Sequence, residues 1–215
     1  MARYTFYTNP MSRGQIVRWA LHEADADYAT VLVDFAKGSP ELEAVNAMRK
    51  VPTLVDHGPG KDGARADRVV TECAAICVYL AETEPAVGLT PTAAERADYW
   101  RWMFFSAGPV EQAVVARSMG WDVPEGREGM VGFGSFDRTM DTLDQHLGSH
   151  AFVCGDRFTM ADVYVGSQVD WGLMFGSIPS RPSFEAYAER FRARPGYKAA
   201  KAIDNALIEA AQKKA

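Results

Sequence analysis

Two short stretches decide the fold of this chain, Lys50-Val51-Pro52-Thr53-Leu54 and Thr71-Glu72-Cys73-Ala74-Ala75-Ile76. In the first, a proline enters a strand-like run, which is one of the few places where a cis peptide bond costs little. A cis bond would turn the backbone N–H and C=O of Val51 outward, toward an extended peptide. In the second, Glu72 stands at the start of an apolar helix whose first N–H groups are free to bind an anion. Together they predict a docking edge for a small charged peptide.

The residues around these stretches alternate between strand-like and helix-like patterns. β-branched and aromatic residues favour strands, and apolar residues three and four positions apart favour a core-facing helix. The expected strands cover residues 4–8, 28–33, 53–55 and 68–70, and the expected helices begin near residues 15, 40 and 73. A loop is expected over residues 57–67. The order βαβ–α–ββα predicts a thioredoxin-like α/β domain over residues 1–83.

The pattern changes after residue 83. Residues 84–92 carry Pro85 and Pro91 and are expected to form a linker. Residues 93–215 are expected to form an all-α domain, with a break or kink at Gly108-Pro109. Thr159 and Asp162 fit the capping box that begins a helix.

The composition excludes several classes of protein. The 215 residues are 47% hydrophobic and 24% charged, with a net charge of −5, which argues against a nucleic-acid surface. No signal-peptide region or membrane-spanning apolar run is visible. Three cysteines without framework spacing fit a reducing compartment. They form neither a metal quartet nor a C-x-x-C motif. We therefore expect a cytoplasmic protein that needs no metal and binds neither nucleic acid nor membrane.

The two opening stretches resemble the glutathione-binding half of the glutathione transferase superfamily. Thr8-Asn9-Pro10-Met11-Ser12-Arg13-Gly14 and Gly155-Asp156-Arg157-Phe158-Thr159-Met160-Ala161-Asp162 match two further motifs of that family, in the family's order. The four motifs span nearly the whole chain and are most similar to those of bacterial, theta-like members with a serine. The resemblance implies a homodimer that conjugates glutathione to a small hydrophobic electrophile, as in detoxification.

The resemblance implies that a hydroxyl group holds the glutathione sulfur as thiolate, the nucleophilic form. Ser12, just before the first helix, matches the serine of theta-like classes, although a serine there also caps helices often. Tyr7 falls on the tyrosine of other classes, and its alternative is packing beneath the helix. Thr8 and Asn9 are further donors. Ser12 ranks first, Tyr7 second and Asn9 third.

The glutathione-binding residues implied by the resemblance are Met11, Lys37, Lys50, Val51, Pro52, Glu72 and Cys73. The backbone of Val51 is expected to pair with the cysteinyl part beside a cis Pro52, and Glu72 to meet the γ-glutamyl end. Cys73 departs from the family's usual serine; it keeps the backbone N–H but offers only a weak S–H donor. A cysteine there is more often a small buried residue than a redox group.

The electrophile is expected between the domains, lined by Met11 and by the first long helix of the second domain. Trp102, Phe105, Pro109 and Arg117 are candidates there, with core packing as the alternative for each. Two other functions stay open. One is a glutathione-dependent reductase, peroxidase or isomerase that uses the same thiolate. The other is a non-catalytic binding module that has kept the fold.

Overall fold

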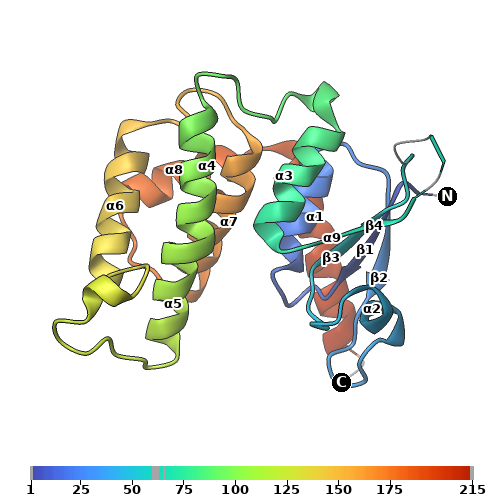
Figure 1. The fold of residues 1–215 in the computed structure, drawn as a ribbon, viewed down its shortest axis with the longest axis horizontal. Helices are drawn as coiled ribbons and strands as arrows, with labels where there is room; N and C mark the ends of the chain where they lie inside the picture. Colours follow the sequence, from blue (N-terminus) through green and yellow to red (C-terminus); the bar gives the residue numbers. More distant parts are fainter. Residues whose placement is uncertain (1, 60–62, 65, 214–215) are drawn as a thin grey trace. The chain divides into compact units, whose positions relative to one another are not determined.

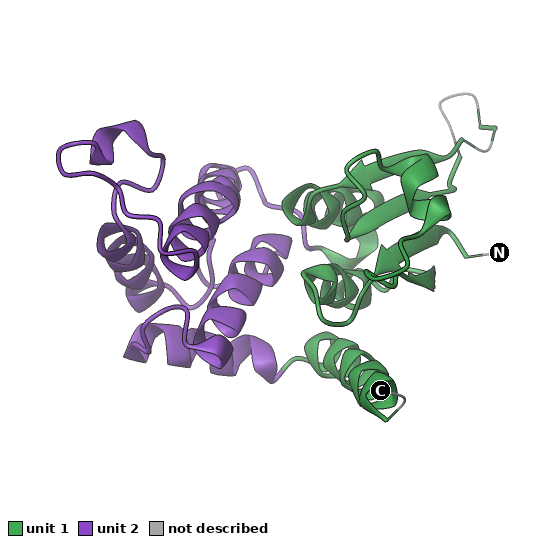
Figure 2. Ribbon diagram, turned by 90° about the horizontal axis from the view of Figure 1, so that it is seen from below, with its two compact units in different colours: residues 1–88, 194–215 green, residues 89–193 purple. Residues whose placement is uncertain are grey.

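The computed structural model describes residues 2–59, 63–64 and 66–213. The chain divides into two compact units (Figure 2). The first contains residues 1–88 and 194–215, and the second contains residues 89–193. The boundary at residue 88 lies inside the expected linker. The last helix, which we expected in the second domain, belongs to the first unit instead.

The first unit contains a four-stranded mixed sheet with the order β2-β1-β3-β4 (Figure 1). β1 runs parallel to β2 and antiparallel to β3, and β3 runs antiparallel to β4. The strands are β1 (Tyr4–Thr8), β2 (Tyr28–Leu32), β3 (Thr53–Asp56) and β4 (Arg68–Thr71). The helices are α1 (Gly14–Glu23), α2 (Pro40–Val45), α3 (Cys73–Thr83), the 3-10 turn η1 (Pro85–Val87) and α9 (Pro195–Gln212). The expected thioredoxin-like order is confirmed. Residues 60–62 and 65 of the expected 57–67 loop lie outside the described residues.

Successive side chains of β1 point to opposite faces of the sheet, and they contact helices on both faces. Tyr4 donates its hydroxyl proton to Glu84 just beyond α3, at 2.8 Å, and the guanidinium of Arg18 in α1 lies 5.3 Å from the centroid of the Phe6 ring. Tyr7, one position along, packs with Leu42 of α2. Figure 1 accordingly shows α1 and α3 on one side of the sheet and α2 on the other.

α9 returns to the first unit and packs along α1. Arg18 and Asp204 form an ion pair of 2.8 Å, and each side chain is only 1% exposed. Nearer the start of α9, the rings of Trp19 and Tyr197 meet edge to face with centroids 5.2 Å apart. Because both contacts join side chains of α1 to α9, the last helix completes the core of the first unit.

The second unit is helical in its described residues. It contains α4 (Arg96–Phe105), η2 (Ser106–Val110), α5 (Glu111–Ser118), η3 (Glu128–Met130), α6 (Phe136–Ser149), α7 (Met160–Phe175) and α8 (Pro182–Arg192). The η2 segment, which contains Pro109, is a π-helical turn between α4 and α5 at the expected kink. The capping box at the start of α7 is confirmed. The Asp162 carboxylate accepts the N–H of Thr159 at 2.8 Å, and the Thr159 side chain accepts the N–H of Asp162.

Candidate functional site

The register of the sheet brings the predicted site segments to one end. Tyr7 pairs with Thr53 across β1 and β3, and Thr53 pairs with Thr71 across β3 and β4. The loop after β1, the Val51-Pro52 approach to β3 and the start of α3 therefore leave the sheet side by side. Thr8 also pairs with Leu32, so the turn after β2 leaves the same end.

Hydrogen bonds brace the loop between β1 and α1. The Asn9 amide donates to the carbonyl of Val33 at 2.9 Å and accepts the N–H of Met11 at 2.9 Å. The Ser12 hydroxyl donates to the carbonyl of Asn9 at 2.6 Å and accepts the N–H of Gly14 at 3.0 Å. Ser12 thus stands at the entrance of α1 with its one proton directed at a carbonyl oxygen. A rotation about the Cβ–Oγ bond would redirect that proton to another acceptor.

Gly14 is a site-forming residue that sequence reasoning missed. A Cβ at this position would lie 1.9 Å from the Oγ1 of Thr8, far inside van der Waals contact. Only glycine therefore lets the first turn of α1 approach the end of β1 this closely. Its position directly after Ser12-Arg13, at the start of the first expected helix, could have indicated this role.

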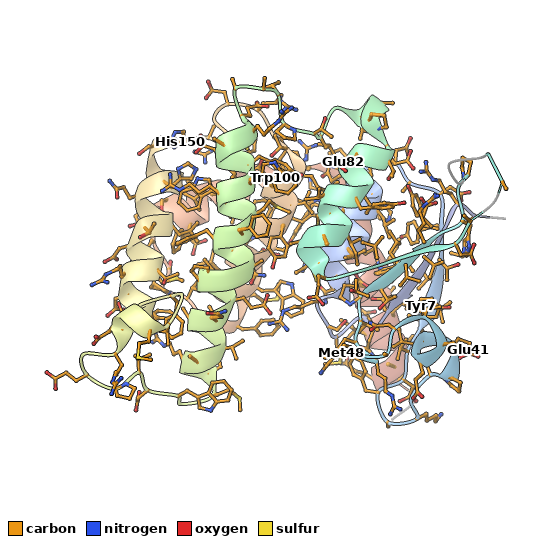
Figure 3. The ribbon with its side chains drawn as sticks, in the orientation of Figure 1. Tyr7, Glu41, Met48, Glu82, Trp100 and His150 are labelled. Carbon is orange, nitrogen blue, oxygen red and sulfur yellow. The ribbon has the colours of Figure 1, made fainter. Side chains whose placement is uncertain are left out.

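Tyr7, labelled in Figure 3, lies in an apolar cluster. Its side chain is 9% exposed and packs with Val33, Leu42 and Val55. Val51, partly buried, packs against the same cluster. This burial fits the alternative interpretation of Tyr7, in which its ring packs in the core and does not serve as the thiolate donor.

Asn46 orders the segment that carries Val51 and Pro52. Its amide donates to the carbonyl of Lys50 at 3.1 Å and to the hydroxyl of Thr53 at 2.9 Å. Thr53 in turn donates to the same Lys50 carbonyl at 2.9 Å. The Val51-Pro52 peptide bond is cis, as expected. Sequence reasoning missed Asn46 and Thr53 as supports, because their bonds depend on the path of the loop between them.

Glu72 and Cys73 form the start of α3. Glu72 is exposed and adopts a positive φ of 67°, and its carbonyl accepts the first helical N–H, from Ile76, at 2.9 Å. Cys73 is 8% exposed, and its Sγ lies 3.7 Å from the carbonyl oxygen of Arg13. This contact joins the start of α3 to the loop that carries Ser12. The low exposure fits the reading of Cys73 as a small buried residue.

The remaining predicted binding residues are exposed. Met11 is 72% exposed, and the Lys50 side chain is also at the surface. Lys37 lies in the turn after β2, where its ammonium is 3.6 Å from the carboxylate of Asp34. Lys50 directly precedes Val51 and is therefore the better placed of the two lysines.

The other cysteines are poor nucleophiles in this structure. Burial raises the pKa of the Cys77 thiol well above its usual range. Burial likewise raises the pKa of Cys154, to about 12. Both thiols are therefore protonated at neutral pH. Among the described residues, no three His, Cys, Asp or Glu side chains form a group that could hold a metal ion. No helix in the described ranges is long and apolar enough to cross a membrane.

The residues proposed for the electrophile divide between the units. Met11 belongs to the first unit, and Trp102, Phe105, Pro109 and Arg117 belong to the second. Trp102 is 1% exposed and stacks on His146, with ring centroids 4.0 Å apart, so it packs in the core of its unit. Arg117 is exposed, and its guanidinium lies 4.3 Å from the centroid of the Phe136 ring.

Residues 11–83 match the family described as "Glutathione S-transferase, N-terminal domain", and residues 91–171 match "Glutathione S-transferase, C-terminal domain". The disulfide-bond oxidoreductase YfcG of Escherichia coli (strain K12) is 26% identical over 198 residues, which cover 88% of this chain and 90% of that protein. Glutathione S-transferase 1 of Schizosaccharomyces pombe is 27% identical over 241 residues, with coverages of 95% and 100%.

A solved structure has the same fold. It is that of a glutathione transferase family member from Pseudomonas fluorescens Pf-5 with two glutathione bound, which is 25% identical to this chain. It superposes with a TM-score of 0.73 over 93% of this chain and 92% of that one. The similarity therefore extends over both units.

Proposed function

Because the chain belongs to the glutathione transferase superfamily, we propose that its first unit binds glutathione and holds the glutathione sulfur as a thiolate. The observation that carries this proposal is the sheet register, which gathers the loop of Ser12, the Val51-Pro52 segment and Glu72 at one end. These segments are far apart in sequence and offer a hydroxyl group, a backbone amide and a carboxylate. Binding glutathione and holding its thiolate requires all three groups.

Each part of glutathione has a partner of matching chemistry. The Glu72 carboxylate suits the γ-glutamyl ammonium, and the N–H groups of the first turn of α3 suit its carboxylate. The backbone of Val51, held in place by the bonds of Asn46 and Thr53, suits the amide groups of the cysteinyl residue. Lys50, and less directly Lys37, suits the glycine carboxylate.

The chemical step needs a hydrogen-bond donor at the sulfur. The Ser12 hydroxyl would rotate from the Asn9 carbonyl, 2.6 Å away, to the sulfur, while its oxygen keeps the N–H of Gly14. A donated hydrogen bond and the nearby N-terminus of α1 both favour the anion and lower the thiol pKa. The thiolate would then attack an electrophilic carbon and form a C–S bond, and the leaving group would depart with its electron pair.

We propose conjugation to a small hydrophobic electrophile as the activity, in a cytoplasmic homodimer that serves detoxification. A glutathione-dependent disulfide reductase is the second candidate, and similarity to the disulfide-bond oxidoreductase YfcG favours it specifically. The same thiolate would attack a disulfide sulfur in place of carbon. Peroxidase and isomerase activities, or a glutathione-binding module without catalysis, would need no change in the binding residues.

An activity panel separates these functions. The purified chain is assayed with glutathione and, in turn, a halogenated nitroarene, a hydroperoxide and a mixed disulfide. Conjugation requires a glutathionyl product with the nitroarene, abolished or strongly reduced in Ser12→Ala. Turnover of the disulfide alone would replace conjugation by reductase activity. Tight glutathione binding with no turnover of any substrate would leave a binding module.

A further inference from the structure

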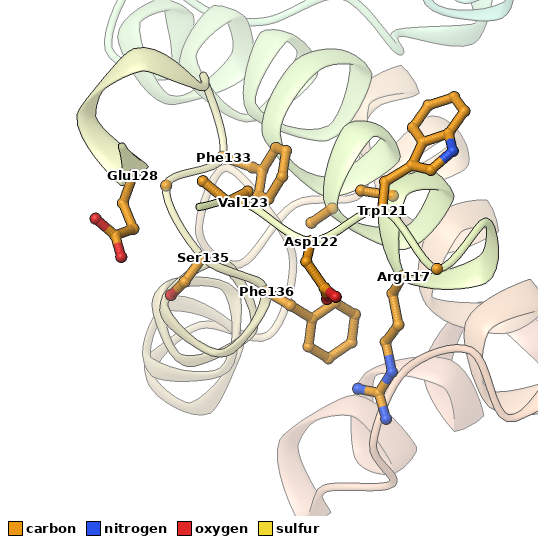
Figure 4. Close-up of a pocket in the computed structure, with 12 residues that line it drawn as sticks. Arg117, Trp121, Asp122, Val123, Glu128, Phe133, Ser135 and Phe136 are labelled. Carbon is orange, nitrogen blue, oxygen red and sulfur yellow. The ribbon is translucent and has the colours of Figure 1, made fainter. Parts of the chain in front are cut away.

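A cavity of about 330 Å³ lies in the second unit, and the end of α5, the segment that joins α5 to α6 and the first residue of α6 line it (Figure 4). Its volume is within the range of small-molecule sites, about 300–1,000 Å³. Ala113 and Ala116 of α5 line it with small side chains, and Phe133 and Phe136 add aromatic rings. All the lining residues lie in the second unit, so the cavity does not depend on the glutathione site.

Local hydrogen bonds shape the cavity walls. α5 ends in a Schellman motif, in which the N–H of Trp121 donates to the carbonyl of Ala116 at 2.8 Å and that of Gly120 to Arg117 at 3.2 Å. Gly120 supplies the left-handed residue with a φ of 65°. On the other wall, the buried Thr139 donates its hydroxyl proton to the carbonyl of Phe133 at 2.9 Å. The backbone at Trp121 and at Phe133, on the two sides of the cavity, is thus fixed by hydrogen bonds of the fold.

The charged residues that line the cavity are two acids and one base, Asp122, Glu128 and Arg117. Arg117 already lies over the Phe136 ring, 4.3 Å from its centroid, which shows that this ring accepts a cation on its face. Asp122 and Phe136 both line the cavity (Figure 4). Across the described parts of the chain, neither Asp122 nor Glu128 has a hydrogen bond or ion pair from its side chain.

We propose that this cavity binds an organic cation with an aromatic or compact apolar body. The apolar body would lie against Ala113 and Ala116 and between the phenylalanine rings, where burial of apolar surface is favourable. The positive group would face Asp122 and Glu128, which leave one negative charge in excess after Arg117 is counted. That excess disfavours an anion of the same size, and two carboxylates without partners favour a cation over a neutral isostere.

The test uses benzyltrimethylammonium as the probe, with its neutral tert-butyl analogue and benzenesulfonate for comparison. Binding to the full chain is followed by calorimetry and by the fluorescence of Trp121, with Trp121→Phe to identify the signal. We expect saturable binding of one cation per chain, at least about tenfold tighter than either comparison compound. Asp122→Asn and Glu128→Gln are each expected to weaken it about three- to tenfold.

Glu125→Gln is the matched control, because this exposed acid lies in the same segment but does not line the cavity. It is expected to bind the cation like the wild type. Phe133→Leu, which keeps the apolar volume but removes the ring, is expected to weaken the cation more than the neutral analogue. Equal affinity for all three probes, tighter binding of benzenesulfonate, no binding of the cation, or equal losses in Glu125→Gln and Asp122→Asn would each overturn the proposal.

Discussion

Gly14 and Thr8 show how single residues position the proposed thiolate donor. The first turn of α1 lies so close to the end of β1 that a Cβ at Gly14 would be 1.9 Å from the Thr8 Oγ1. The N–H of Gly14 also donates to Ser12 at 3.0 Å. The same glycine therefore permits the close approach and orients the hydroxyl.

Gly14→Ala is expected to destabilise the protein by about 1–3 kcal/mol, because crowding at a packed site outweighs the helix propensity of alanine. Thr8→Ala removes the crowding oxygen, so the double variant is expected to lose less than the sum of the two single losses. Urea unfolding measures both. Gly148→Ala in α6 is the control, since its new Cβ would meet Ser183 at an ordinary 3.9 Å. A harmless Gly14→Ala would contradict the close approach.

Among the elements, β3 depends on one buried carboxylate. Asp56 is 0% exposed and accepts hydrogen bonds from Tyr79 at 2.7 Å, Arg68 at 2.8 Å and the Gly58 N–H at 2.7 Å. Burial by itself would raise the pKa of Asp56, but these hydrogen bonds outweigh that effect and lower the pKa below its usual value, to about 2. The ionised carboxylate thus ties β3 to β4 and α3.

The resulting pH dependence has a definite sign. The folded pKa of Asp56 lies below the unfolded value of about 3.9, so its contribution is complete above pH ~5 and disappears as pH falls toward 2. The stability difference between wild type and Asp56→Asn is expected to be constant from pH 5 to 7. It is expected to shrink by about 2 kcal/mol between pH 5 and 2. Urea unfolding across this range measures it, with the exposed Asp156→Asn as control; a difference independent of pH would contradict the assignment.

The elements that hold the proposed site were largely predictable, but their supports were not. Period-two and helical patterns locate the strands and helices of the first unit within one or two residues, and the proline motif locates the Val51-Pro52 approach. Asn46 and Thr53 could not be identified, because their shared contact with the Lys50 carbonyl depends on how the loop between them closes. The packing of Tyr7 against Leu42 likewise depends on which face α2 covers.

At the scale of the whole molecule, the end of the chain returns to its beginning. The pattern of residues 197–212 predicts a helix but does not identify its partner, so the assignment of α9 to the second domain was wrong. The residues that join α9 to the first unit are Arg18 and Asp204, whose 2.8 Å ion pair is almost fully buried. Sequence alone cannot pair two charges that are 186 residues apart.

Asp204→Ala is expected to destabilise the protein by about 3–5 kcal/mol, because it leaves the Arg18 guanidinium buried without its counter-ion. Arg18→Met combined with Asp204→Leu is expected to recover much of this loss, since two apolar side chains replace two buried charges. Urea unfolding of the full chain provides the comparison. A cost below about 1 kcal/mol for Asp204→Ala would show that α9 does not depend on this pair.

The most direct measurement is the ultraviolet difference absorbance of bound glutathione thiolate at neutral pH, in wild type, Ser12→Ala and Tyr7→Phe. Calorimetry on each variant first establishes that glutathione is bound. We expect a thiolate signal in wild type and in Tyr7→Phe, and none in Ser12→Ala. A signal lost only in Tyr7→Phe would transfer the donor role to Tyr7, and no signal in wild type with glutathione bound would contradict thiolate stabilisation altogether.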